Sequence, residues 1–256
     1  MGTAAFVVTG AAVFVSASPA QALGLGWSMS WSYTSNTAFA YSAVMPDGAL
    51  TGVGSEGPGG TRSVKATITD TLADVYCARV TVATSAMPGF LVDKMVCGAG
   101  ATATVSTGAF TGSAMISLYR MKPGSPTIYR QIDISIPDAT KAPGLAAPGN
   151  GANWQYFSDT GFRYHLTGPG VRLTGQGVDG QVGDRKADTK VVNTATTPNF
   201  CVNGSIRDKF QSVGSGVLCT PGQVGVFSGT YIEKFVFAGC WSDWCLSEDI
   251  LAVGVG

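Results

Sequence analysis

Short stretches of alternating apolar and polar residues dominate this chain. Residues 64–69 read Val-Lys-Ala-Thr-Ile-Thr and residues 132–136 read Ile-Asp-Ile-Ser-Ile, and similar stretches lie at 75–82, 101–105 and 114–118. A period of two places the apolar side chains on one face of an extended backbone, so each stretch predicts a half-buried β-strand. No window of about twelve residues keeps helical spacing without Gly or Pro.

Turn residues separate these stretches. Examples are Pro46-Asp47-Gly48, Pro58-Gly59-Gly60 and Lys122-Pro123-Gly124. Short strands that recur every 8–12 residues or so, with turn chemistry between them, are typical of β-sandwiches. The sequence therefore predicts an all-β protein of sandwich type, and immunoglobulin-like and jelly-roll topologies fit it equally well.

An eleven-residue phrase occurs twice. Residues 31–41 and 154–164 share the pattern W-x-Y-x-S-[ND]-T-x-F-x-Y at an offset of 123 positions, and L-T-G-x-G-x-[ED]-G follows at the same offset in 50–57 and 173–180. A period this long suits a complete domain rather than a short structural repeat. The pattern predicts a tandem duplication, with homologous β-sandwich domains at residues 31–138 and 154–256, each with its own core. We interpret the glycine motif as scaffold, because no helix follows it to make a phosphate site.

Two segments lie outside the predicted copies. Residues 139–153 contain two Pro-Gly pairs and predict a semi-stiff linker. Residues 23–30 form an extra N-terminal strand segment whose apolar side chains alternate with Gly and Ser; these side chains are Leu23, Leu25, Trp27 and Met29. An uncharged strand of this kind needs a partner, so it either completes a sheet of the first domain or adds to another protein as a binding site.

The N-terminus carries the features of an export signal. Ala4 to Val15 is an apolar run, and Ala20-Gln21-Ala22 is a small-x-small cleavage site, so we expect a signal peptide at 1–22. The run is too short to cross a hydrocarbon core of ~30 Å, so no membrane insertion of the mature chain is expected. The protein is predicted to be secreted and extracellular. Its composition resembles that of exported proteins of high-GC Gram-positive bacteria.

The six cysteines of an exported chain predict disulfides. Two pairs occupy equivalent places in the two copies and should each close within its copy, which leaves a third pair near the C-terminus. The predicted bonds are Cys77–Cys97, Cys201–Cys219 and Cys240–Cys245. No thiol then remains for catalysis or for a metal, so neither a metal nor a cofactor is expected.

Catalytic signals are sparse. The chain has one histidine, His165, and no G-x-S-x-G motif, so we predict that it is not an enzyme. A carboxylate pair is the remaining enzymatic option. Candidates are Asp243, Glu248 and Asp249, and the loop residues Asp179, Asp184 and Asp188, which are either a weak calcium site or a solvated loop.

With 16 basic and 16 acidic residues and no run of either sign, a nucleic-acid partner is not expected.

We name the segment Cys240-Trp241-Ser242-Asp243-Trp244-Cys245 the tryptophan loop. It belongs to the second copy only, because the first has Tyr119 to Gly124 in its place. A six-residue loop closed by a disulfide should expose at least one indole, so Trp241, Asp243 and Trp244 are a candidate binding site. The other interpretation is that both rings fold over the edge of the sandwich.

Together these features predict a non-enzymatic adaptor or structural subunit that joins other secreted or surface proteins into an extracellular assembly. The N-terminal strand and the tryptophan loop would be its contact points. One alternative is a carbohydrate-binding or cell-wall-binding protein that stacks glycans on the tryptophan loop. The other is a secreted hydrolase with a carboxylate pair that the sequence does not reveal.

Overall fold

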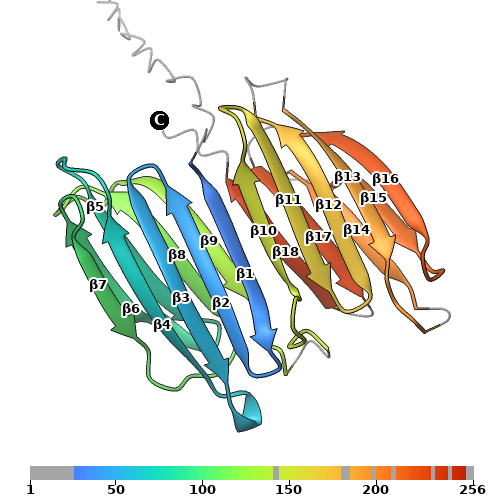
Figure 1. Cartoon of the computed structure of the whole chain (residues 1–256), viewed down its shortest axis with the longest axis horizontal. Helices are drawn as coiled ribbons and strands as arrows, with labels where there is room; N and C mark the ends of the chain where they lie inside the picture. Colours follow the sequence, from blue (N-terminus) through green and yellow to red (C-terminus); the bar gives the residue numbers. More distant parts are fainter. Residues whose placement is uncertain are drawn as a thin grey trace, which may run out of the picture.

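The computed structural model describes residues 26–140, 144–179, 185–197, 200–208, 212–231, 234–241 and 244–251. Apart from a 3₁₀ turn at Pro58–Gly60, every regular element in these ranges is a β-strand, and the all-β prediction is confirmed (Figure 1). None of the described segments is a helix with the length and apolar character needed to cross a bilayer.

The strands of the first half are β1 (Ser28–Ser35), β2 (Ala38–Met45), β3 (Gly48–Glu56), β4 (Arg62–Asp70), β5 (Cys77–Thr84), β6 (Met87–Cys97), β7 (Thr102–Ser106), β8 (Ala114–Met121) and β9 (Ile128–Ile136). Those of the second half are β10 (Gly151–Tyr156), β11 (Gly161–Gly168), β12 (Val171–Val178), β13 (Lys186–Asn193), β14 (Val202–Arg207), β15 (Ser212–Leu218), β16 (Val224–Thr230), β17 (Lys234–Trp241) and β18 (Trp244–Leu251).

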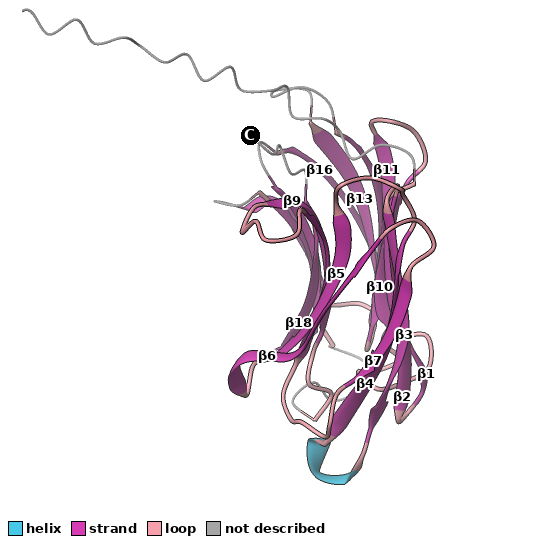
Figure 2. Cartoon of the chain, turned by 90° about the vertical axis from the view of Figure 1, so that its left-hand side faces the viewer, coloured by secondary structure: helices cyan, strands magenta, loops and turns pink. Residues whose placement is uncertain are grey.

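These strands form two layers. One layer is a ten-stranded sheet in the order β16-β13-β12-β11-β10-β1-β2-β3-β4-β7. The other consists of two four-stranded sheets, β6-β5-β8-β9 and β15-β14-β17-β18, which cover the large sheet from one side (Figure 2). The strand order of the first half matches that of the second position for position. A tandem duplication would leave this shared strand order, and the duplication itself stays a prediction.

The two halves are not separate sandwiches. Antiparallel pairing of β1 with β10 makes the large sheet continuous, and the buried apolar side chains of both halves form one cluster. The prediction of an independent core in each copy is therefore wrong. Pairing β1 with β10 removes two sheet edges that would otherwise expose unpaired backbone groups.

The predicted linker is packed against this sheet rather than acting as a spacer. Leu145 is fully buried, and the Asn150 side chain donates hydrogen bonds to the carbonyls of Gly144 and Leu145 at 2.9 and 3.1 Å. The amide of Tyr33 donates to the Asn150 carbonyl at 2.9 Å, and β10 begins at Gly151. Part of the linker range therefore belongs to the core and the large sheet.

The predicted N-terminal strand segment pairs within the chain. Trp27 and Met29 are only 3% and 1% exposed, and Met29 lies opposite Trp154 across the β1–β10 pair. The segment is not surplus to the repeat, because β10 also begins three residues before its own Trp154. A role of Trp27 and Met29 as exposed contacts for a partner is excluded. Leu23 and Leu25 lie outside the described residues.

The glycine motif makes room for the rings of the repeated phrase. A Cβ atom at Gly52 would lie 2.2 Å from the ring of Tyr41, and one at Gly175 would lie 2.2 Å from Tyr164. The Tyr41 hydroxyl crosses its glycine to reach the Lys65 carbonyl at 3.0 Å. The two repeated motifs are therefore one packing unit, in which glycines of β3 and β12 accept aromatic side chains of β2 and β11.

Two of the predicted disulfides are confirmed. Cys77 is bonded to Cys97 and Cys201 to Cys219, each within its own half. Cys240 is also disulfide-bonded, and its backbone pairs with that of Cys245 across the β17–β18 hairpin. The side chain of Cys245 lies outside the described residues.

Candidate interaction surfaces

The tryptophan loop does not present Trp241 to solvent. The Trp241 side chain is 3% exposed, and its ring lies 2.8 Å from the position that a Cβ atom on Gly168 would take. It lies on the inward face of β17 with Phe235 and Phe237, which are fully buried. The prediction of Trp241 as an exposed binding residue is wrong. Asp243 and the side chain of Trp244 lie outside the described residues.

The acidic loop after β12 does not gather its carboxylates. Asp179 is fully buried, accepts a hydrogen bond from the Tyr156 hydroxyl at 2.8 Å and pairs with Arg185 at 3.0 Å. Asp188 instead lies on the outer face of β13, where it accepts a hydrogen bond from the Ser228 hydroxyl at 2.6 Å. Asp179 and Asp188 therefore do not share a calcium site. Asp184, Asp243 and the side chains of Glu248 and Asp249 lie outside the described residues.

The buried Tyr156, Asp179 and Arg185 have counterparts 123 positions earlier. There the Tyr33 hydroxyl donates to Glu56, and Glu56 pairs with Arg62 at 2.8 Å. Burial and the adjacent carboxylate raise the pKa of both tyrosines, so each hydroxyl remains a proton donor. The acidic position of the repeated glycine motif is therefore a structural anchor. Among the described residues, no three His, Cys, Asp or Glu side chains are grouped to hold a metal ion.

His165 lies on the outer face of β11 and is half-buried. Its Nε2 lies 2.7 Å from the Thr167 hydroxyl. Burial lowers the pKa of His165, and the positive charge of Arg172 lowers it further, so the imidazole is neutral at physiological pH.

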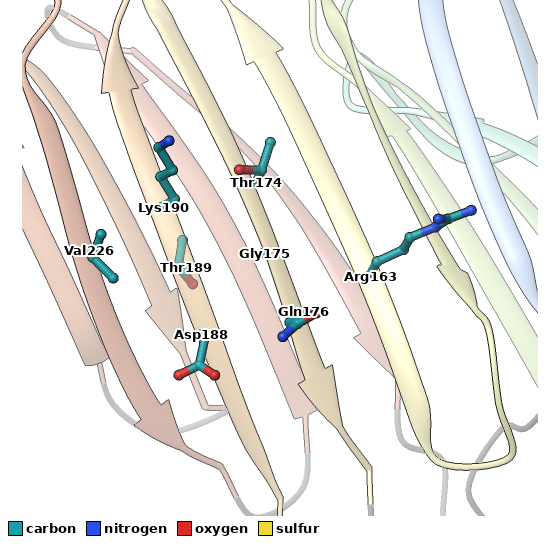
Figure 3. Close-up of a pocket in the computed structure, with 8 residues that line it drawn as sticks. All are labelled: Arg163, Thr174, Gly175, Gln176, Asp188, Thr189, Lys190 and Val226. Atoms are coloured by element: carbon teal, nitrogen blue, oxygen red, sulfur yellow. The ribbon is translucent and has the colours of Figure 1, made fainter.

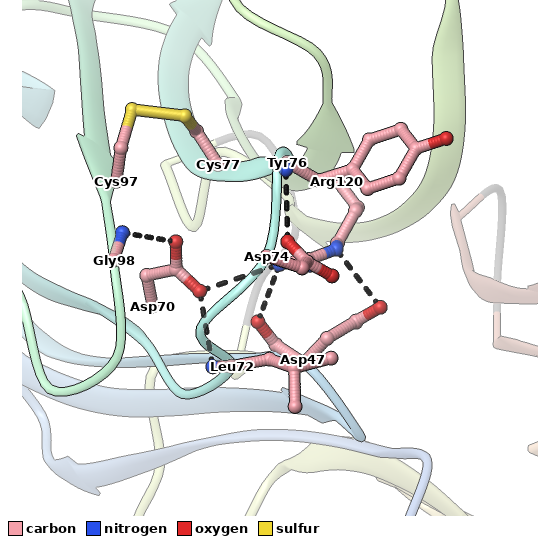
Figure 4. Close-up of a disulfide and its surroundings, with 9 residues drawn as sticks. All are labelled: Asp47, Asp70, Leu72, Asp74, Tyr76, Cys77, Cys97, Gly98 and Arg120. Atoms are coloured by element: carbon pink, nitrogen blue, oxygen red, sulfur yellow. Dashed lines mark hydrogen bonds and ion pairs between the residues drawn. A yellow bond between two sulfur atoms is a disulfide. The ribbon is translucent and has the colours of Figure 1, made fainter.

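A buried ionic cluster occupies the position in the first half that Trp241 occupies in the second. Arg120 lies opposite Ala78, as Trp241 lies opposite Val202. The Arg120 guanidinium is 3% exposed and contacts three carboxylates, those of Asp47 at 3.0 Å, Asp70 at 3.3 Å and Asp74 (Figure 4). Asp47 also pairs with Arg130 at 2.6 Å. Removing Arg120 would leave the fully buried Asp70 carboxylate without a positive partner.

This cluster fixes the loop between β4 and β5. Asp70 accepts hydrogen bonds from the backbone amides of Leu72 at 3.2 Å and Gly98 at 2.9 Å. Asp74 accepts one from the amide of Tyr76 at 2.8 Å, immediately before the disulfide-bonded Cys77. Carboxylates that bind backbone amides hold a turn in one conformation.

The fixed loop carries exposed apolar side chains. Leu72 is 48% exposed and Val75 65% exposed. The ring of Tyr76 makes an edge contact with Tyr129 of β9, with ring centroids 4.4 Å apart, and the Arg120 guanidinium lies 5.4 Å from the Tyr76 ring centroid. Tyr129 is 43% exposed. We name these side chains, together with the adjacent exposed Ile128, the tyrosine patch: Leu72, Val75, Tyr76, Ile128 and Tyr129.

The start of the described chain lies beside this patch. The guanidinium of Arg130, next to Tyr129 in sequence, lies 5.6 Å from the centroid of the Trp27 ring. Arg130 also pairs with Asp47 of the ionic cluster. Trp27 therefore packs against Arg130, which is joined through Asp47 to the ionic cluster that supports the tyrosine patch.

A second surface covers the outer face of the large sheet in the second half. Its charged side chains are Arg163, Arg172, Lys186, Lys190 and Asp188. The residues 123 positions earlier are Ala40, Ala49, Ser63, Thr67 and Lys65. The four cations are therefore specific to the second half. We name this surface the basic face.

A shallow groove of about 330 Å³ runs across the basic face (Figure 3). Its side chains come from β11, β12, β13 and β16, and they are Arg163, Thr174, Gln176, Asp188, Thr189, Lys190 and Val226, with Gly175 in its floor. Arg163 extends away from the groove toward β10, where it donates to Gln155 at 3.3 Å (Figure 3).

Sequence reasoning missed both surfaces. The tyrosine patch joins residues about fifty positions apart, and no local motif marks it. The basic face has a weak signal, because Lys186 and Lys190 alternate with the apolar Ala187 and Val191 and so had to share a solvent-facing side. Comparison with models of known protein families finds no match, and comparison with curated proteins finds no match either.

Proposed function

We propose that this chain is a secreted, non-catalytic binding protein that attaches another secreted or surface protein through the tyrosine patch. Export rests on the predicted signal peptide at 1–22. The two confirmed disulfides support it, because such bonds persist in oxidising compartments outside the cytosol. The adaptor function expected from the sequence is retained, with the tyrosine patch as its contact point in place of the N-terminal strand and the tryptophan loop.

The observation that carries this proposal is the exposure of apolar and aromatic side chains on a rigid frame. Exposed clusters of this kind mark protein interfaces, whose cores are enriched in Tyr and depleted of charge. The loop is already ordered by Asp70, Asp74 and the Cys77–Cys97 bond, so binding would lose little conformational entropy. Rigid aromatic anchors are typical of binding hot spots.

The burial of Trp241 weakens the carbohydrate alternative in its original form, because that hypothesis used the tryptophan loop as a stacking platform. The hydrolase alternative has no support from Asp179, which is used as a buried anchor. The side chains of Glu248 and Asp249 lie outside the described residues, so that part of the hydrolase hypothesis stays a prediction.

Capture from culture supernatant tests the proposal. The bait is the mature protein, compared with a variant carrying Val75→Ser and Tyr129→Ser. The matched control carries Val53→Ser and Phe157→Ser, which also removes one exposed valine and one exposed aromatic ring, 56% and 51% exposed, at positions that do not belong to the patch. We expect wild type and control to retain the same protein, and the patch variant to bind it at least tenfold more weakly, since one hot-spot residue contributes about 2 kcal/mol.

Melting temperatures of the two variants should agree, because all four positions are exposed. Equal retention by both variants, or no specific retention by wild type, would contradict the proposal.

A further inference from the structure

The basic face concentrates positive charge in a protein whose total formal charge is zero. Four cations and one carboxylate leave a local charge of +3, whereas the whole chain has 16 basic and 16 acidic residues. Within the described part of the chain, none of the four cations belongs to an ion pair. Their charge is therefore available to a ligand.

The cations are spread over the face rather than focused on one point. Lys186 and Lys190 are four residues apart on β13, which is about 13 Å at ~3.3 Å per residue. Arg163 lies two strands from Asp188 in the same cross-strand row, about 10 Å away at ~4.8 Å per strand. A small anion would meet one cation, whereas a polymer with a negative charge on each repeat would meet several.

Uncharged hydrogen-bonding groups lie between the cations. Thr174 and Gln176 of β12 line the groove, and Asn153 and Gln155 follow on β10 in the same cross-strand rows. Asp188 lines the groove from β13, between Lys186 and Lys190, and has more acceptor sites than the Ser228 hydroxyl uses. A carboxylate at this place repels a ligand that offers only negative charge and accepts hydrogen bonds from a ligand that also carries hydroxyl groups.

We propose that the basic face binds an acidic polysaccharide, with uronate carboxylates on the cations and sugar hydroxyls on Asp188, Thr174 and Gln176. Charge complementarity selects a polyanion, and the Asp188 carboxylate selects a hydroxyl-rich one over a nucleic acid or an acidic peptide. This site is independent of the tyrosine patch and of the tryptophan loop. It gives the second half a ligand of its own.

The test measures binding of the full mature protein to polygalacturonate by isothermal titration calorimetry at low and at physiological salt. The variant Lys186→Gln/Lys190→Gln is compared with Lys65→Gln/Lys94→Gln, a pair of exposed lysines in the first half. Both variants lose two positive charges, so any effect of net charge alone is the same. We expect the first variant to bind at least tenfold more weakly and the second to bind within threefold of wild type. Binding should also weaken as salt screens the charges.

Polyglutamate, single-stranded DNA and neutral dextran serve as competing probes. We expect polygalacturonate to bind at least tenfold more tightly than any of them, and Asp188→Asn to reduce its preference over polyglutamate. Equal loss in the two lysine variants would overturn the site. Binding of polyglutamate or DNA as tight as that of polygalacturonate would overturn the acidic polysaccharide as ligand. No binding of polygalacturonate by wild type would overturn both.

Discussion

At the scale of single residues, corresponding positions of the two halves carry side chains of different chemistry. Arg120 and Trp241 hold matching places in β8 and β17, where one binds buried carboxylates and the other packs on Gly168. In the first half, Arg120 and its carboxylates fix the neighbouring loop, whose apolar side chains stay exposed. In the second half, the indole of Trp241 fills the same end of the sandwich.

We therefore expect Trp241→Ala to destabilise the protein rather than to weaken binding. Truncating a buried Trp should lower the free energy of unfolding by about 3–5 kcal/mol, because it leaves a cavity that the sheet cannot close. Chemical denaturation measures this change. Phe157→Ala, at a position 51% exposed, is the control and should change it by less than about 0.5 kcal/mol. A small effect of Trp241→Ala on unfolding would restore the tryptophan loop as a surface site.

The burial of Trp241 could have been predicted from its strand. Phe235, Phe237 and Trp241 occupy alternate positions of β17, so a period of two places all three side chains on the buried face. A six-residue loop closed by a disulfide predicts a turn here instead. Strand register continues to Trp241, and register decides which face a side chain takes.

At the scale of elements, the seam between β1 and β10 depends on a close approach of two backbones. A Cβ atom at Gly151 would lie 2.1 Å from the Trp31 carbonyl oxygen and 2.6 Å from the Cα of Ser32. No side chain fits there without moving one strand. Gly151, which lies within the predicted linker, is therefore needed for β1 and β10 to pair in the large sheet.

Gly151→Ala should lower the free energy of unfolding by about 1–3 kcal/mol, the usual cost of overpacking a well-packed site. At ~2–4 °C per kcal/mol for a chain of this size, the melting temperature should fall measurably. Gly108→Ala is the matched control, because nothing lies within 4 Å of its Cβ position. The same small shift in both variants would show that the seam tolerates a side chain.

The alternating patterns predicted where the strands lie, but not which strands pair with each other. Residues 64–69 and 132–136 lie within β4 and β9, and the repeated phrases supply the buried rings of both halves. Alternation tells which face of a strand is buried, but not which strand lies beside it. Nothing in the pattern of residues 28–35 showed that β1 would pair with β10 as well as with β2.

At the scale of the whole molecule, one sandwich presents two surfaces of different chemistry. The tyrosine patch is apolar and lies at the end of the first half, whereas the basic face is charged and covers the outer face of the second. Along the chain, charged residues form no run of either sign. In a sheet, charges at alternate positions of several strands converge without forming a run, which is why Arg163, Lys186 and Lys190 went unnoticed.

The position of Trp27 beside Arg130 leads to a prediction about the N-terminus. The predicted mature chain starts at Leu23, three residues before Gly26, where the described chain begins. A folded tag fused directly before Leu23 should therefore obstruct the tyrosine patch and reduce capture of the protein partner at least tenfold. The same tag after Gly256 is the control and should leave capture unchanged. Polygalacturonate binding should be the same in both fusions, because the basic face lies in the other half.

Deleting residues 23–30, by contrast, should unfold the protein. The deletion removes the buried Trp27 and Met29 and three of the five residue pairs that join β1 to β10. Circular dichroism of the deletion variant distinguishes loss of fold from loss of binding. If the N-terminal tag leaves capture unharmed while Val75→Ser/Tyr129→Ser abolishes it, the patch is used from a direction that the N-terminus does not block. If neither change affects capture, the partner binds elsewhere and the tyrosine patch is not the interface.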